Sequence, residues 1–284
     1  MPSNECHLQC RISRSLQKAL QEEQVRTDDS ISHIVERALA NELDVVHHSL
    51  FQVSTSSALV EGVFGGCIRV EDLRRHGDFG SGTFDGLDGE MVMLNGQCVQ
   101  VHPGGFAEVA SDDVLVPFAM VTRFVADRTC RLEQAASYQD LQEQLDHLRP
   151  SDNLFVGFRI DGAFTNLSLR AACRADQGEN LVEAIEHQSK FHADKMEGTL
   201  VGFWAPPYSS AISVPGYHFH FVNAAMNFGG HVFDLQGERL QVAVHHETDL
   251  HLAIPETKQF LEADLRNDSS NALETAEKDH RSSV

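Results

Sequence analysis

The chain has 284 residues, of which 42% are hydrophobic and 23% charged, a composition typical of a globular protein with one large domain or two ordinary ones. Its formal net charge of −20 argues against general nucleic-acid binding, because a polyanion would be repelled at long range. The sequence shows neither a signal peptide nor an apolar run near the roughly 20 residues of a membrane helix, and its six cysteines are scattered, so we expect a cytoplasmic protein with reduced thiols and no membrane partner.

Residues 1–48 predict a small strand–helix–helix module. The alternation in CHLQCRI predicts a half-buried strand, and Ser13 caps the helical run RSLQKALQEEQV, in which Leu16, Leu20 and Val25 are expected to face inward. After TDDS ends this helix, SISHIVERALANEL again places apolar residues at helical spacing. The pattern resembles the ribbon-helix-helix module of bacterial repressors, whose strands pair between two chains and bind DNA.

The charge of residues 1–48 argues against DNA binding by this module. The segment contains five Lys or Arg and eight Asp or Glu, a net charge of −3, whereas such modules usually lean basic. A strand and two short helices bury little apolar surface alone, so pairing with a second copy is expected in either case. We therefore expect a dimerising appendage and keep DNA binding as the alternative.

Residues 49–284 predict a second domain, of α+β class, with mostly antiparallel or mixed β-sheets and a few helices. GEMVMLNGQCVQV predicts a hairpin around Asn95 and Gly96, and LFVGFRIDGAFTNLSLRAACRA predicts another around Asp161 and Gly162. SYQDLQEQLDHLRP and ENLVEAIEHQ predict helices, and GTLVGFWAP, GYHFHFVN, HVFDLQGERLQVAVHH and DLHLAIP predict further strands. We keep open a division of this domain into two sub-domains, 49–150 and 151–284.

The stretch GYHFHF carries the strongest chemical signal from spacing alone. On a strand, His218 and His220 share one face while the aromatic residues occupy the other, and two imidazoles roughly 6.6 Å apart along the strand can converge on one metal ion. If HVFDL forms a neighbouring strand, His231 completes a facet of three histidines. Three protein ligands leave metal positions free for water or substrate, which is typical of catalytic sites.

Other interpretations of the histidines remain. A single buried histidine is usually a hydrogen-bonded core residue. Three further histidines, His245, His246 and His251, are not flanked by aromatic residues as the histidines of GYHFHF are. Because adjacent residues on a strand face opposite ways, we expect these three to be structural. The cupins also carry an HxH motif, but they follow it with Glu three or four residues later, where this chain has Asn223 and Ala224.

Several stretches together resemble the alpha-acetolactate decarboxylases from about residue 50 to about residue 277. They are LFQVSTSSALVEGVFGG, HGDFGSGTFDGLDGEM, VPFAMVTRF, GTLVGFWAPPYSSAISVPGYHFHF and GGHVFD. The combination of GDFGSGTFDGLDGEM with GYHFHF and GGHV is highly specific to that family. The first 48 residues lie outside this resemblance, and the chain reads RAACRADQ where family members read close to RTVPRQ.

The resemblance implies roles for individual residues. It implies that Zn²⁺ is bound by three of them: His218, His220 and His231. It implies catalytic roles for Thr83 in GTF, Glu90 in LDGEM, Arg170 with Arg174 beside it, and Glu277 in ALETAEKD, with Glu274 as the alternative one turn away. Without the resemblance, Glu90 and Thr83 would be interpreted as turn residues and Arg170 as a salt-bridge residue.

The resemblance also implies a reaction: the zinc-dependent decarboxylation of 2-acetolactate to acetoin and carbon dioxide, in acetoin and butanediol biosynthesis. A homodimer is favoured by the ribbon-like module and by the family alike. The alternative is a DNA-binding regulator that uses a decarboxylase-like domain as a sensor of a metal or metabolite. Retention of the histidines, the arginine and a glutamate favours catalysis, because sensing needs no proton donor.

Overall fold

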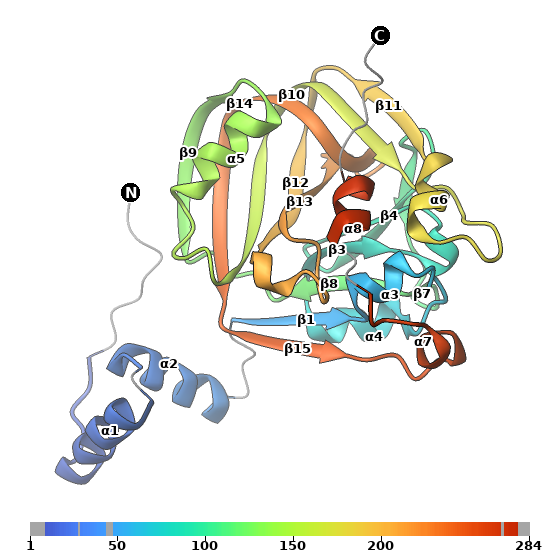
Figure 1. The fold of residues 1–284 in the computed structure, drawn as a ribbon. Coiled ribbons are helices and arrows are strands. Elements are labelled where there is room, and N and C mark those ends of the chain that lie inside the picture. Colours follow the sequence, from blue (N-terminus) through green and yellow to red (C-terminus); the bar gives the residue numbers. More distant parts are fainter. Residues whose placement is uncertain (1–8, 28, 44–47, 268–269, 278–284) are drawn as a thin grey trace.

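The structure is a computed structural model, and it describes residues 9–27, 29–43, 48–267 and 270–277, without the side chains of residues 41, 274 and 277. Two large β-sheets pack against each other, and short helices lie around them (Figure 1). The fold class is α+β with antiparallel and mixed sheets, as predicted. Within the described ranges, none of the helices combines the length and the apolar character that crossing a membrane requires.

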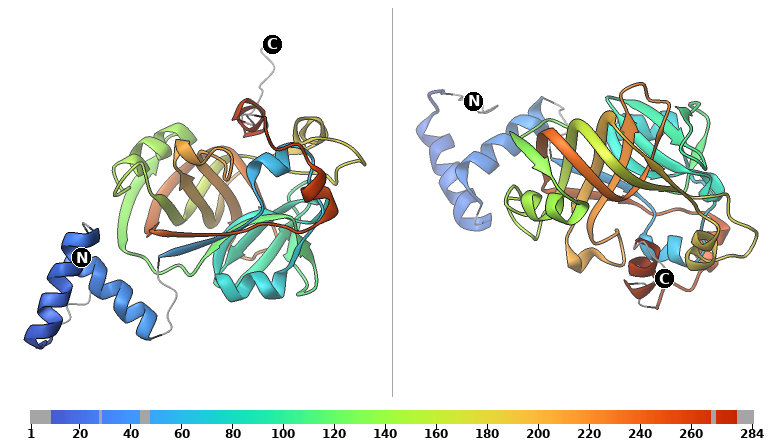
Figure 2. Two further views of the ribbon diagram at one scale, coloured as in Figure 1. Left: turned by 60° about the horizontal axis from the view of Figure 1, so that its bottom comes forward. Right: turned by 90° about the horizontal axis from the view of Figure 1, so that it is seen from above.

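The N-terminal helices α1 (Arg14–Thr27) and α2 (Ile31–Glu42) lie to one side of the sheets in all views (Figures 1 and 2). As predicted, Ser13 caps α1: its Oγ accepts a hydrogen bond from the backbone N of Leu16, at 3.2 Å. The apolar side chains that were expected to face inward are largely exposed in the single chain, and no residue of α1 is buried.

The predicted N-terminal strand is not formed within the described residues. Residues 1–8 lie outside the description, and Gln9–Ser13 belong to no strand. A ribbon strand of this kind pairs with the same strand of a second chain, so one chain alone supplies no hydrogen-bonding neighbour. The strand stays a prediction for an assembled dimer.

The first sheet has seven strands and includes the predicted Asn95–Gly96 hairpin. In order across the sheet they are β15 (Asp249–Ala253), β1 (Ser49–Val53), β8 (Phe118–Thr122), β3 (Phe79–Thr83), β4 (Glu90–Leu94), β5 (Gln97–Val101) and β6 (Ala107–Val109). Neighbours are antiparallel except β15 and β1, which are parallel. Between β4 and β5, Asn95 and Gly96 both have positive φ, 53° and 77°, as a two-residue hairpin turn requires.

The second sheet has six strands, four of which close into a ring. Across the sheet they are β11 (Ser189–Ala193), β10 (Phe155–Ala171), β12 (Met196–Ala205), β13 (Gly216–Asn223), β14 (Gly229–Glu247) and β9 (Arg128–Ala135). Because β10 also pairs with β14, the strands β10, β12, β13 and β14 form a closed circuit. The sheets do not coincide with residues 49–150 and 151–284, since β9 joins the second sheet and β15 the first; that division stays a prediction about folding units.

The predicted hairpin around Asp161 and Gly162 is wrong. Strand β10 continues through both residues, which pair with Thr199 and Gly198 of β12. The Asp161 carboxylate accepts hydrogen bonds from Arg159 Nε (2.8 Å) and Thr199 Oγ1 (2.7 Å), so its polar atoms are satisfied inside the sheet. The Asp-Gly pair marks a register shift against β14 instead of a turn.

Short helices and a two-stranded sheet complete the fold. They are α3 (Ser56–Val60), α4 (Val70–His76), α5 (Tyr138–Asp146), α6 (Leu181–Glu186), α7 (Lys258–Glu262), α8 (Ser270–Glu277), the 3₁₀ turns η1 (Asp85–Leu87) and η2 (Pro207–Ser209), and the pair β2 (Ile68–Arg69) with β7 (Leu115–Val116). Helices α5 and α6 confirm the two helices predicted from the sequence. Ser137 caps α5, and Asn180 and Glu183 form a capping box at the start of α6.

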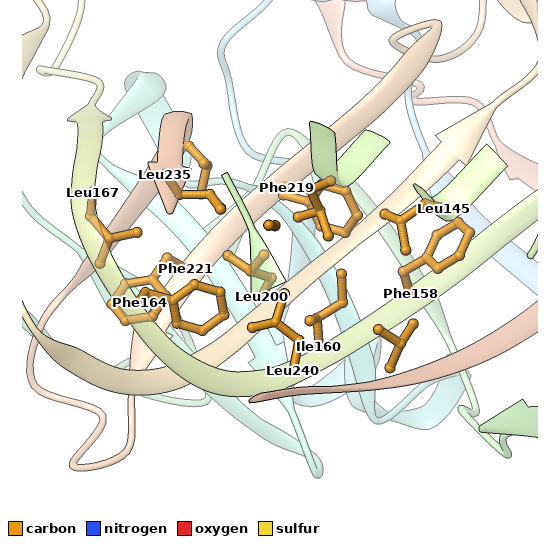
Figure 3. Packing of buried hydrophobic residues seen from close by; sticks show 14 of the residues in the cluster. Leu145, Phe158, Ile160, Phe164, Leu167, Leu200, Phe219, Phe221, Leu235 and Leu240 are labelled. Carbon is orange, nitrogen blue, oxygen red and sulfur yellow. The ribbon is translucent and has the colours of Figure 1, made fainter. Parts of the chain in front are cut away.

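The hydrophobic core explains why β13 presents histidines on one face. Phe219 and Phe221 are fully buried and point into the cluster inside the second sheet, beside Phe158 and Phe164 of β10 (Figure 3). Each such burial stabilises the fold by about 1.5–3 kcal/mol. The strand alternation therefore places the even-numbered histidines of β13 on the opposite face, toward the first sheet, where β13 approaches β4.

Candidate active site

Three histidines from two neighbouring strands meet at one point. His220 of β13 is the register partner of His231 of β14, which is the pairing that the sequence predicts. His218 Nε2 lies 2.9 Å from His231 Nδ1, and the three residues each offer a nitrogen within 4.8 Å of the others. His220 and His231 are 1% and 2% exposed. The facet is therefore a group of two buried imidazoles and one half-buried imidazole that could hold a metal ion.

His220 has a fixed orientation, and one of its ring nitrogens makes no hydrogen bond with a described residue. His220 Nδ1–H donates a hydrogen bond to the carbonyl oxygen of Met91 on β4, at 2.8 Å, so Nε2 carries the lone pair. Nε2 is buried and makes no hydrogen bond with any described residue, while Glu90 Oε2 lies 3.4 Å away. A histidine with one nitrogen held by a carbonyl and the other facing a cluster of imidazoles has the arrangement of a metal ligand.

Two of the rings are held in the neutral state. Burial lowers the pKa of His218 well below its ordinary value, and the nearby His220 and Arg170 lower it further. Burial likewise lowers the pKa of His231, with Arg170 as the next contribution. At neutral pH both imidazoles are therefore uncharged and keep a lone pair for a cation.

The close approach of β14 to β10 depends on glycine. A Cβ on Gly230 would lie 2.8 Å from the carbonyl oxygen of Arg170, nearer than real Cβ contacts, so no larger residue fits without a shift of the backbone. The next residue, His231, is the register partner of Arg170. The GGH sequence therefore brings the third histidine beside the arginine.

Glu90 begins β4 and faces the histidines. It is 6% exposed, and its Oε1 accepts a hydrogen bond from the backbone N of Ala172 at 3.0 Å. Thr83 is its register partner on β3, and the Thr83 hydroxyl donates to the carbonyl oxygen of Gly89 at 2.8 Å. The hydroxyl therefore fixes the turn before Glu90 and has only acceptor capacity left for the pocket.

Arg170 lies near the end of β10 and is 6% exposed. Its Nη1 donates a hydrogen bond to Gln188 Oε1 at 3.0 Å, and its guanidinium carbon lies 5.4 Å from the centre of the Phe233 ring. Arg174 does not join the site, because its guanidinium group binds Asp85 in an ion pair of 3.0 Å on the surface. Sequence reasoning missed Gln188, whose only signal was its place as the last residue of the predicted helix ENLVEAIEHQ.

A pocket joins these groups beneath an apolar cover. Thr83, Glu90, Arg170, His218 and His220 line it together. The cover comes from α3, α6 and α8 and from neighbouring loops, and its residues at the pocket are Leu59, Leu87, Leu181, Ile185, Val214, Leu273 and Ala276. A polar floor under an apolar cover strengthens electrostatic interactions with a bound anion, because water is excluded.

The predicted C-terminal glutamate falls on α8, which contributes to this cover. The side chains of Glu274 and Glu277 lie outside the described part of the chain. Leu273 and Ala276 of the same helix are 2% and 1% exposed and line the pocket. The structure thus places the helix at the site, and the identity of the glutamate stays a prediction.

Comparison with known proteins gives consistent matches. The family model of alpha-acetolactate decarboxylase matches residues 50–267. The alpha-acetolactate decarboxylase of Methanosarcina mazei is 40% identical over 251 residues, which cover 88% of this chain and 86% of that protein; the one of Bacillus subtilis is 35% identical over 230 residues, 80% and 90%. The crystal structure of the alpha-acetolactate decarboxylase from Bacillus subtilis superposes with a TM-score of 0.79 at 34% identity, over 81% of this chain and 100% of that one.

The match to the Methanosarcina mazei protein also reaches into the N-terminal segment. Residues 50–284 number only 235, so a match over 251 residues of this chain includes part of the segment that the sequence resemblance left out. Each of these relatives is covered over more than four-fifths of its length. The chain belongs to the alpha-acetolactate decarboxylase family.

Proposed function

We propose that the chain is a carboxy-lyase that converts 2-acetolactate to acetoin and carbon dioxide, with Zn²⁺ held by His218, His220 and His231. The observation that carries this function is the convergence of the three imidazoles beside a pocket that His218 and His220 line together with Glu90 and Arg170. Family membership supplies the substrate, since the relatives are alpha-acetolactate decarboxylases. The pocket supplies the groups that such a reaction needs.

The residues present fit a zinc ion. Neutral imidazoles are preferred zinc ligands, and three of them leave a position open for substrate. The buried Nε2 of His220, which has no hydrogen-bond partner among the described residues, is accounted for by coordination. When bound, the ion supplies a Lewis acid that stabilises negative charge on the hydroxyl and ketone oxygens of the substrate.

Arg170 is suited to hold the carboxylate of the substrate. Its planar fork of donors matches a carboxylate, and its charge is permanent. Gln188 holds one arm of the fork at 3.0 Å, which fixes the orientation of the group before substrate arrives. A buried cation also offsets the repulsion that an anionic substrate meets from a chain of net charge −20.

The remaining requirement is a proton. When the bond between C2 and the carboxyl carbon breaks, its electron pair flows into the adjacent ketone, so no organic cofactor is needed as electron sink. C2 must then gain a proton, and Glu90 or Glu277 donates it, the other glutamate positioning the hydroxyl or water. Delivery from one face gives a single enantiomer of acetoin.

The direct test of this function is acetoin formation by the zinc-loaded full-length protein. Because 2-acetolactate also decarboxylates without enzyme, the blank contains zinc and substrate alone, and the product is resolved on a chiral column. We expect acetoin well above the blank and in one enantiomer. Racemic acetoin at the rate of the blank would contradict the function.

The position of Glu277 on α8 favours this residue over Glu274 as the second catalytic glutamate. Position 277 follows Leu273 by about one helical turn and shares its face, whereas position 274 is rotated by roughly 100° from it. We expect Glu277→Gln to lower kcat by at least about 100-fold and Glu274→Gln, its matched control, to leave kcat unchanged. Steady-state acetoin assays on both variants decide between them; the reverse result would assign the role to Glu274.

The N-terminal helices are proposed to pair two copies of the chain. Leu16, Val25, Ile31 and Leu39 are 50%, 87%, 43% and 40% exposed, and large apolar side chains gathered on an exposed surface favour contact with a partner. The net charge of −3 over residues 1–48 favours pairing over DNA binding. A homodimer joined at this module is the arrangement that covers these side chains.

Deletion of residues 1–43 is expected to preserve kcat and to change association. The cut leaves His48, whose carbonyl oxygen accepts hydrogen bonds from the backbone N of Thr248 (2.9 Å) and Asp249 (3.0 Å). Light scattering on a sizing column should show a smaller assembly than for the full-length protein. Loss of turnover in a truncated protein that is still folded and metal-loaded would refute the modular organisation. If the full-length protein shifts a DNA fragment that contains the promoter of its own gene on a gel, DNA binding is favoured instead.

A further inference from the structure

A second cluster of histidines and carboxylates lies away from the pocket. It combines His48 just before β1, Asp127 just before β9, and His245 and Glu247 at the end of β14. Strand β14 carries His231 near its start, so the two histidine clusters lie at opposite ends of one long strand (Figure 1). None of these four residues lines the active-site pocket.

The distances within the cluster suit a metal ion. Asp127 Oδ1 lies 3.5 Å from His48 Nε2, and Asp127 Oδ2 lies 3.5 Å from His245 Nδ1. All three residues offer ligand atoms within 4.8 Å of one another. Two ligands of a tetrahedral zinc ion, each about 2.0–2.1 Å from the metal, lie roughly 3.3 Å apart, so small adjustments bring the three atoms onto one ion.

The second nitrogen of each histidine faces an acceptor. His48 Nδ1 donates a hydrogen bond to the carbonyl oxygen of His246, and His245 Nε2 faces Glu247 Oε1 at 3.6 Å. Asp127 is oriented by His246, whose backbone N and Nδ1 donate to Oδ2 at 2.9 and 2.8 Å. Metal-bound histidines and carboxylates are held by outer partners in this way.

Hydrogen bonding alone leaves the cluster incomplete. His245 is 1% and Glu247 3% exposed, yet neither ring nitrogen of His245 and neither carboxylate oxygen of Glu247 makes a hydrogen bond of normal geometry with a described residue. Buried polar atoms are nearly always paired, because leaving them unpaired is costly. A cation on Nδ1 of His245 would satisfy that atom and direct its Nε2–H to Glu247.

We propose that His48, Asp127 and His245 bind a second zinc ion and that Glu247 positions His245. The three ligands come from the start of the first sheet, the connection between the sheets and the end of the longest strand. The site therefore joins segments that are far apart in the sequence and fixes the residue at which the N-terminal module enters the domain. Its role is structural, and it is independent of the catalytic site.

Metal stoichiometry of the full-length protein tests the second site. The protein is stripped with a chelator, reloaded with Zn²⁺, desalted and analysed by plasma mass spectrometry. We expect two zinc ions per chain in the unchanged protein, one in Asp127→Asn, one in His218→Ala and close to none in the double variant. Asp113→Asn, the same change at an exposed position, is the matched control and should keep two.

Thermal unfolding gives a second readout that does not involve activity. In His218→Ala, where only the second site remains intact, added Zn²⁺ should raise Tm, and His48→Gln in that background should abolish the rise. One zinc ion per chain in both the unchanged protein and Asp127→Asn, or an undiminished rise of Tm with His48→Gln, would overturn the proposal. If the catalytic histidines bind no zinc but the second site does, the unchanged protein should hold one zinc ion per chain. Asp127→Asn should then remove this ion, and His218→Ala should leave it bound.

Discussion

His218→Ala is expected to reduce acetoin formation from 2-acetolactate by at least about 10³-fold and to remove one zinc ion per chain. A single donor to a developing oxyanion is worth about 10²–10³ in kcat, and loss of the metal removes the larger part of the stabilising charge. His218 is only partly buried, whereas His220 and His231 are 1% and 2% exposed, so its truncation disturbs the core least. Activity and metal content are measured on the same preparation.

The matched control for this variant is His192→Ala, which removes an exposed imidazole from β11 in the same sheet. It should keep both full turnover and the metal content of the unchanged protein. Circular dichroism must show that both variants are folded. A folded His218→Ala protein with normal turnover would refute the catalytic role of the histidine facet.

Glu90→Gln is expected to lower kcat by about 10²–10⁴ while the metal is retained. The change keeps an oxygen that can accept the hydrogen bond from the backbone N of Ala172 but removes the acid that lies 3.4 Å from His220. General acid catalysis contributes an effect of this size, and a glutamine cannot deliver the proton. Rate, metal content and acetoin enantiomer are measured together.

The enantiomer separates the two roles open to Glu90. If Glu90 donates the proton to carbon, residual acetoin from the variant should lose its optical purity, because bulk water then protonates either face. If Glu90 only positions the hydroxyl, the residual product stays a single enantiomer. Glu133→Gln, an exposed change on β9, controls for the loss of one charge. Unchanged kcat in a folded Glu90→Gln protein would remove Glu90 from the catalytic residues.

Local patterns predicted the convergence of His218, His220 and His231, because the placement of each depends on neighbours in the sequence. The alternation of GYHFHF sends Phe219 and Phe221 into the core and turns His218 and His220 to the other face. The connection to GGHV is short, so β13 and β14 pair as neighbours and deliver His231. The Asn-Gly hairpin between β4 and β5 was predicted for the same reason.

Patterns misled where tertiary contacts decide the outcome. An Asp-Gly pair indicates a turn in isolation, yet Arg159 and Thr199 satisfy Asp161 inside a 17-residue strand that pairs on both sides. The apolar cover reaches the pocket only because α3, α6 and α8 pack together over it, and Gln188, which follows α6, meets Arg170 there. Helix packing of this kind has no periodic signature in a single sequence.

The second histidine cluster shows the same limit more sharply. Adjacent histidines on a strand face opposite ways, which argued against a metal site at His245 and His246. In the structure only His245 is a candidate ligand, while His246 orients Asp127 from the other face. The remaining partners, His48 and Asp127, lie far away in the sequence and join His245 through the sheets. No spacing rule connects three such segments.

The most direct measurement of the catalytic account is turnover of one preparation before and after metal removal. The protein is stripped with a chelator until mass spectrometry finds no zinc, assayed with 2-acetolactate, and assayed again after Zn²⁺ is returned. A divalent ion held by three imidazoles predicts acetoin at the rate of the uncatalysed blank in the stripped protein and full recovery with zinc. Undiminished, enantiomerically pure turnover by the stripped protein would contradict it.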